Sequence, residues 1–122
     1  MTTVATLTDG ETRLMKVLWE YGPSTVAAIV GALPRKKPVA YNTVQTLMRI
    51  LETKGYVTHE QTGRAFLYRA LVDQPTARRR ALDHLKKALF DNSSRLLMLN
   101  LLEDEELDPE RAAELKRLIE RG

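Results

Sequence analysis

The chain has 122 residues, 43% of them hydrophobic, with a formal net charge of +3 and no cysteine. This length suits one compact domain or a small domain with an appendage, and the lack of cysteine excludes disulfides, thiolate metal sites and cysteine nucleophiles. The first residues lack a basic start followed by an apolar run, and no stretch is apolar enough to span a bilayer, so we expect a cytoplasmic protein without membrane insertion.

Two helices are predicted at the start of the chain. Thr8 and Glu11 have the spacing of a capping box, and the apolar stripe behind them stops before Gly22. Ser24 is expected to cap a second helix that ends at Pro34. This pair of helices predicts a small helical support for the central part of the chain.

A basic loop with a proline at each end comes after the second helix, and its cations are Arg35, Lys36 and Lys37. Because the loop leads directly into the next predicted helix, we interpret it as a phosphate-binding segment. A solvated run of charge in a turn is the alternative interpretation.

A third helix is predicted between Ala40 and Gly55, because its apolar residues recur at spacings of three and four and Gly55 suits a C-terminal stop. The opposite side carries short amides, hydroxyls and one guanidinium, which can match base edges in a DNA major groove. The predicted base-reading residues are Asn42, Thr43, Gln45, Thr46 and Arg49. Asn42 and Gln45 also have the spacing of an N-cap and its reciprocal partner, so capping is an alternative role for them.

A β-hairpin is predicted after this helix, with strands Tyr56–Glu60 and Ala65–Leu71 joined by a turn through residues 61–64. A helix followed by a hairpin is the order of a winged helix, in which the helix lies in the major groove and the hairpin tip reaches the sugar-phosphate backbone. The residues expected at the backbone are Arg35, Lys36, Lys37, Tyr41, Gly63 and Arg64.

The last fifty residues predict three further helices, beginning near residues 75, 94 and 109. The middle helix is apolar almost all round and needs cover on every side. We therefore expect a homodimer, with contacts through Leu82, Leu85, Leu89, Leu96, Leu97, Leu99 and Leu102. The predicted fold is mainly α with a small antiparallel β wing: a winged helix-turn-helix domain over residues 1–73 and a helical dimerisation region over residues 74–122.

The charge distribution agrees with this division. Residues 1–80 contain 12 Lys or Arg against 6 Asp or Glu, whereas residues 81–122 contain 7 against 10. Because phosphate contacts dominate nucleic-acid affinity, a basic first part is typical of a polyanion-binding module joined to a module with another task.

The sequence contains no pattern of a catalytic or metal site. His59 and His84 stand apart from any nucleophile or ligand cluster, and the acidic run at residues 103–106 is interpreted as a solvated connector. We therefore expect no enzymatic activity, no metal and no cofactor.

The chain resembles the penicillinase-repressor family, which includes methicillin-resistance and copper-transport repressors, over nearly its whole length. The residues that carry the resemblance are Leu7-Thr8 with Glu11, Leu18-Trp19, Gly22-Pro23 with Thr25-Val26, the run from Ala40 to Thr46, Lys54-Gly55, Arg64 and Tyr68. The likeness implies a dimeric transcriptional repressor that binds an inverted-repeat operator in double-stranded DNA. The copper-responsive branch uses C-terminal cysteines, which this chain lacks, so copper sensing is not expected.

In several members of that family a membrane-bound sensor protease ends repression by cutting the dimerisation region after an asparagine. The matching bond is Asn100–Leu101, where leucine replaces the family's phenylalanine. Without the likeness, Asn100 is simply a polar position on a buried helix, with its amide bonded across the interface. Two other functions stay open: a winged-helix regulator with a small-molecule pocket between its domains, and a winged-helix module for protein contacts.

Overall fold

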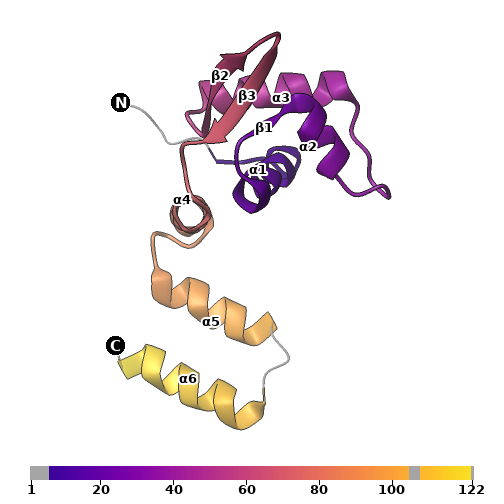
Figure 1. The fold of residues 1–122 in the computed structure, drawn as a ribbon. Helices are drawn as coiled ribbons and strands as arrows, with labels where there is room; N and C mark the ends of the chain where they lie inside the picture. The colour runs from indigo at the N-terminus through magenta and orange to yellow at the C-terminus, as the bar shows by residue number, and fades with distance from the viewer. Residues whose placement is uncertain (1–5, 105–107, 122) are drawn as a thin grey trace. The chain divides into compact units, whose positions relative to one another are not determined.

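The computed structural model describes residues 6–104 and 108–121. The chain divides into two compact units at Arg80. We call residues 6–80 the head and residues 81–121 the tail, and describe each separately. The expected fold class is confirmed, because the described residues are mostly helical with one small three-stranded antiparallel sheet (Figure 1). The predicted functional division between residues 73 and 74 stays a prediction.

The head begins with α1 (Asp9–Tyr21), β1 (Ser24–Thr25) and α2 (Val26–Ala32). The predicted capping box of α1 is confirmed: the backbone N–H of Glu11 donates to Thr8 Oγ1 at 3.2 Å, and the N–H of Thr8 donates to Glu11 Oε1 at 2.9 Å. Gly22 ends this helix with a φ of 83°, which favours glycine.

The predicted cap of α2 at Ser24 is wrong by one residue. Thr25 is the N-cap, and its hydroxyl accepts from the backbone N–H of Ala28 at 3.1 Å. Ser24 instead lies in β1, where it pairs with Tyr68 of β3 (Ala65–Ala70), and its hydroxyl donates to the Gly22 carbonyl. This two-residue strand is too short to produce any alternation in the sequence.

Helix α3 (Tyr41–Thr53) is followed by β2 (Val57–Thr62), which pairs with β3, so the strand order is β1-β3-β2. The hairpin was predicted, but its turn is tighter than expected. Only Gly63 and Arg64 connect the strands, and Gly63 has a φ of 62°. Glycine at the first position of a two-residue turn matches the right-handed twist of the strands.

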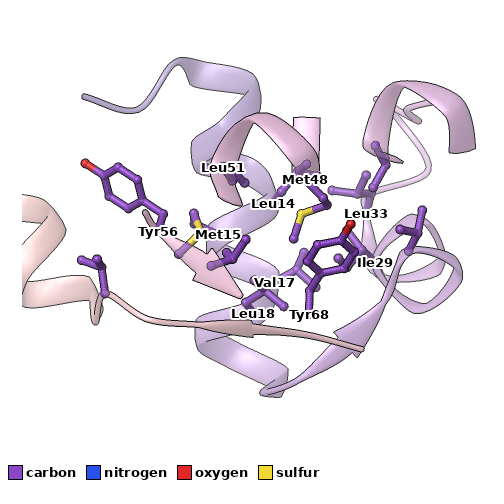
Figure 2. Packing of buried hydrophobic residues seen from close by; sticks show 14 of the residues in the cluster. Leu14, Met15, Val17, Leu18, Ile29, Leu33, Met48, Leu51, Tyr56 and Tyr68 are labelled. Carbon is purple, nitrogen blue, oxygen red and sulfur yellow. The ribbon is translucent and has the colours of Figure 1, made fainter. Parts of the chain in front are cut away.

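The core of the head lies between the three helices and the sheet (Figure 2). Its completely buried members come from every part of the head and include Leu14, Met15, Ile29, Val44, Met48, Leu51, Tyr56, Val57 and Tyr68. Trp19 packs against this core, and its indole Nε1 donates to the Val72 carbonyl at 2.8 Å. The core fixes one side of α3 and thereby determines which side stays exposed.

Helix α4 (Gln74–Leu89) begins in the head, where Ala77 joins the core, and ends in the tail. The tail continues with α5 (Ser94–Asp104) and α6 (Pro109–Arg121), which pack side by side (Figure 1). Ser93 and Asp108 supply side-chain acceptors at the starts of these two helices. Residues 105–106 of the predicted acidic connector lie outside the described residues. No helix in the described ranges has the length and apolar character needed to cross a membrane.

Candidate nucleic-acid interface

Helix α3 has one buried and one exposed side. Val44, Met48 and Leu51 are each 0% exposed, whereas Asn42 and Arg49 on the opposite side are exposed. Thr43 and Thr46 are also exposed and Gln45 is half-buried. The five predicted base-reading side chains are therefore spread over the accessible surface of one helix, and none belongs to the core.

The capping role considered for Asn42 and Gln45 is wrong. Ala40 is the N-cap of α3 and no side chain makes a cap hydrogen bond there, so Asn42 lies inside the first turn. Thr46 Oγ1 donates to the Asn42 carbonyl at 3.0 Å. The Thr46 hydroxyl proton is thus used within the helix, and this side chain offers lone pairs and a methyl group to the outside.

The basic loop between α2 and α3 is held in a defined shape. The backbone N–H of Lys37 donates to the Pro34 carbonyl at 3.1 Å, and the guanidinium of Arg13 from α1 donates to the Lys37 carbonyl. Arg35, Lys36 and Lys37 all remain exposed. Sequence reasoning missed Arg13, because nothing in the sequence links positions 24 residues apart.

A partly buried ion pair fixes the C-terminal end of α3 to the start of α1. Lys54 Nζ lies 2.6 Å from Glu11 Oε1 and 3.1 Å from the Thr6 carbonyl, and Glu11 is only 2% exposed. Burial raises the pKa of Glu11, but the hydrogen bonds from Lys54 and the Thr8 backbone, with the charge of Lys54, outweigh it and lower the pKa below its ordinary 4.5. The pair anchors the helix that carries the exposed face.

The hairpin of β2 and β3 presents an exposed Arg64 at its tip, and Gln61 Nε2 donates to the Gly63 carbonyl at 3.3 Å. Nearer the core, His59 contacts Glu52 of α3, a contact that the sequence pattern did not reveal. Burial, and then the charge of Glu52, raise the pKa of Tyr68, which lies beside His59.

The three arginines at the start of α4 include two with partners inside the head. Arg80 lies over the Tyr56 ring, 5.5 Å from its centroid, and Arg79 donates to Thr76 Oγ1 at 3.2 Å. Arg78 is exposed. These contacts stabilise two of the three arginines at a helix N-terminus, where the helix dipole is unfavourable for cations.

In the tail, many of the predicted dimer leucines are open to solvent. Leu82, Leu85, Leu89 and Leu96 are 51%, 36%, 73% and 40% exposed, whereas Leu97 is buried and Leu99 and Leu102 are half-buried. An apolar groove of about 670 Å³ lies between α5 and α6. Its lining is Ser94, Arg95, Met98, Leu101, Leu102, Leu115, Leu118 and Ile119.

The predicted cleavage bond lies within α5. Asn100 and Leu101 are both exposed. The Asn100 amide donates to the Leu96 carbonyl one turn earlier at 2.9 Å, so its bond lies within α5 and not across an interface as the alternative expected. His84 is exposed as well. Among the described residues, no group of three or more acidic or imidazole side chains is placed to hold a metal ion.

Residues 7–121 match the family model described as "Penicillinase repressor". The penicillinase repressor of Bacillus licheniformis is 24% identical over 120 residues, covering 98% of this chain and 94% of that protein. The methicillin resistance regulatory protein MecI of Staphylococcus aureus strain N315 is 20% identical over 113 residues, covering 93% and 92%.

Two solved structures resemble the head. The solution structure of the DNA-binding domain of the repressor BlaI is 27% identical, with a TM-score of 0.53 over 61% of this chain and 90% of that chain. The Bacillus licheniformis BlaI monomeric form in complex with the blaP half-operator is 26% identical, with a TM-score of 0.51 over 62% and 93%. The described winged-helix arrangement is thus shared with known DNA-binding domains.

Proposed function

The chain belongs to the penicillinase repressor family of DNA-binding transcriptional repressors, a family of regulators rather than enzymes, and on this premise we propose that it binds an inverted-repeat operator as a homodimer. Each head reads one half-site, and the tails join the two heads. The solved BlaI monomer on a half-operator supports one head per half-site.

The observation that carries this proposal is the two-sidedness of α3. Its inner side is fixed by Val44, Met48 and Leu51 at 0% exposure, while its outer side offers amide, hydroxyl and guanidinium groups. A rigid helix with such groups suits direct readout in the major groove, because base edges must be met at fixed positions. The base-reading residues are Asn42, Thr43, Gln45, Thr46 and Arg49.

Backbone contacts surround this face. The loop with Arg35, Lys36 and Lys37 precedes α3, and the tip with Gly63 and Arg64 comes after it, so cations stand at both ends of the helix in sequence. Tyr41 is half exposed in the first turn and offers a hydroxyl to phosphate. Phosphate contacts of this kind set the register of a protein on the duplex and supply most of its salt-dependent affinity.

Dimerisation uses the exposed leucines of α4 and α5. Side chains such as Leu82 and Leu89, more than half exposed in one protomer, gain about 25 cal/mol for each Å² that a second copy removes from water. A two-fold protein requires a two-fold operator, and the two α3 helices should then lie roughly 34 Å apart, about one turn of DNA.

Repression ends when a sensor protease cuts Asn100–Leu101. The bond lies inside α5 and both residues are exposed in the protomer, so a cut separates the last part of α5 and all of α6 from the head. The hydrogen bond from Asn100 to the Leu96 carbonyl is the competing reason for an asparagine here. Exposure of the chain to its sensor protease, followed by mass measurement of the fragments, distinguishes these roles.

The main test is an electrophoretic shift of the full-length protein with a promoter-derived inverted repeat, one half-site and a scrambled duplex. A salt concentration of about 0.15 M suppresses purely ionic binding. We expect tight binding to the inverted repeat, weaker binding to the half-site and the weakest binding to the scrambled duplex. Equal affinity for all three duplexes contradicts sequence-specific repression and favours the alternative in which the basic surface binds an acidic protein.

A ligand-controlled repressor is a second candidate. The sequence-based alternative placed its pocket between the two domains, whereas the apolar groove that favours it lies between α5 and α6 of the tail. The groove is lined mainly by Met98, Leu101 and Leu118, with Arg95 as its cation, so an amphipathic anion is the ligand class that suits it. Release of the operator by such a compound, with the chain uncut, separates this mechanism from proteolysis.

A further inference from the structure

A hydrogen-bonded contact between His59 and Glu52 joins the last turn of α3 to the first half of β2. His59 Nδ1 lies 2.7 Å from Glu52 Oε1 and 2.9 Å from Glu52 Oε2. Both side chains are about one-third exposed, at 31% and 33%. With a proton on Nδ1, the imidazole donates to a carboxylate, and this type of hydrogen bond is shorter and stronger than one between neutral groups.

The imidazole ring is also held by its neighbours on the hairpin. It stacks on Phe66 with centroids 4.3 Å apart and planes 27° apart, and the tilted Tyr68 ring lies 5.5 Å away. His59 and Tyr68 are paired in the register of the two strands, and Tyr68 is buried in the core. The ring therefore links α3, β2 and β3 at one point.

Strand β1 still pairs with β3 one residue beyond this point, through Thr25 and Leu67, but the hairpin tip from Gln61 to Phe66 has only two strands. Glu60, Gln61 and Thr62 of β2 are exposed, as is Arg64 at the turn. A two-stranded ribbon alone is marginally stable in water. At about 3.3 Å per residue, a rotation of roughly 15° at His59 moves the tip by roughly 3 Å, which is as long as a hydrogen bond to phosphate.

We propose that Glu52 and His59 form a latch that positions the wing relative to α3, so that Arg64 meets a backbone phosphate while the exposed side of α3 meets the bases. The inference rests on the proposed function, because it assigns these two residues a positioning role in DNA binding. Neither residue needs to touch DNA. Glu52 and His59 act by positioning Arg64. Their substitution should therefore have no effect of its own once Arg64 is removed, which distinguishes them from groups that bind phosphate directly.

The test measures DNA affinity of the full-length protein against salt, using a duplex enriched from a random pool by the wild-type protein. The slope of log affinity against log salt falls by ~0.9 for each phosphate that the protein no longer neutralises, so Arg64→Ala sets the reference loss. We expect Glu52→Ala and His59→Phe to give the same loss of slope, and neither to add to the loss in a double variant with Arg64→Ala.

The choice of variants separates the latch from charge and from folding. Glu52→Ala removes a negative charge and, by charge alone, should strengthen DNA binding. Glu60→Ala removes an equal charge from the hairpin, where Glu60 makes a long 3.9 Å contact with Arg69, and it should keep the wild-type slope. His59→Phe keeps the ring stacking while removing the donor, so the fold is retained. His59→Asn restores a donor near Nδ1 and should restore the slope.

Full slopes for Glu52→Ala and His59→Phe overturn the latch, as does an equal loss in Glu60→Ala or an unchanged slope in Arg64→Ala. A wild-type protein that binds the enriched duplex no better than random DNA contradicts the proposed function instead. The two outcomes are distinguishable. The latch is overturned by variants of a protein that still binds the enriched duplex specifically, whereas the proposed function is contradicted when the wild-type protein shows no specific binding.

Discussion

The head encloses a buried apolar core, whereas several large apolar side chains of the tail are exposed. In the head, Leu14 and Leu51 are 1% and 0% exposed, and sheet and helices cover them from several sides. In the tail, Leu89 is 73% exposed and Leu118 is 58% exposed. The head buries its core within one chain, whereas the tail leaves apolar surface that a second chain can cover.

The difference arises from the patterning of the helices. Helix α3 has a single apolar side, so one core satisfies it, but α5 carries apolar residues around its whole circumference. Helix α6 packs against one side of α5 and cannot cover the apolar residues on its other sides. The head can therefore fold around its own core, whereas the tail leaves apolar surface that the proposed dimer would cover.

Removal of the tail after Asn100 is the strongest way to test this comparison. A chain that ends there loses part of α5 and all of α6, so we expect loss of the dimer and a fall in whole-operator affinity of ~10² to 10⁴. Head folding and half-site affinity should be unchanged, because every base contact remains. Sedimentation and titration with whole and half operators measure both effects, and undiminished dimerisation contradicts the proposed switch.

A matched pair of leucine truncations compares the two regions directly. Leu51→Ala creates a cavity in the head and should lower the free energy of unfolding by ~2–5 kcal/mol at any protein concentration. Leu89→Ala makes the same chemical change at an exposed site and should cost under about 0.5 kcal/mol in the monomer. Denaturant titrations at two protein concentrations check this, since any larger loss at Leu89 must depend on concentration if a dimer buries it.

The fold was predictable wherever the signal lies within a short stretch of the sequence. The apolar spacing of α3, the capping box at Thr8 and the glycine turn at Gly63 are all local signals, and all three elements are present. Strand β1 was not predictable, because it has two residues and exists only through pairing with Tyr68 and its neighbour. The placement of Ser24 failed for the same reason.

The candidate site was predictable only in part. The exposed side of α3 can be deduced from periodicity alone, so its residue types could be assigned to DNA chemistry. The supports of that side could not be assigned, since Arg13 on the Lys37 carbonyl and His59 on Glu52 are tertiary contacts. Whether each exposed side chain meets a base stays a prediction.

Single substitutions on α3, in the basic loop and in the tail should change different properties of operator binding. Arg49→Ala or Thr46→Ala should relax discrimination between operator variants by ~1–3 kcal/mol if the change removes a base contact, whereas Lys37→Ala should weaken all sequences similarly. Leu96→Ala in the tail should weaken whole-operator binding and leave both half-site affinity and sequence preference unchanged. Titration against a set of single-base operator variants measures all of these, and equal effects of Arg49→Ala and Lys37→Ala on operator and random DNA contradict the assignment.

The smallest expected effect concerns two carboxylates, one buried in the head and one exposed in the tail. Burial raises the pKa of Glu11, but its contacts with Lys54 and Thr8 produce a net lowering from the ordinary 4.5. The hydrogen bond from Lys87, 3.0 Å away, likewise lowers the pKa of Asp83. Each carboxylate therefore adds stability above its unfolded pKa, and this contribution is lost as pH falls through the lower folded pKa.

Salt should distinguish these two groups. Because Glu11 is 2% exposed, its contribution should persist at about 0.5 M salt, whereas that of the exposed Asp83 should disappear. Denaturant titrations between pH 7 and pH 3, roughly the range in which carboxylates titrate, compare wild type with Glu11→Gln and Asp83→Asn. We expect Glu11→Gln to flatten the acid loss of stability at low and high salt, and Asp83→Asn to have a smaller effect at low salt only. An acid profile of Glu11→Gln that equals wild type at both salt concentrations contradicts a stabilising role for the partly buried pair.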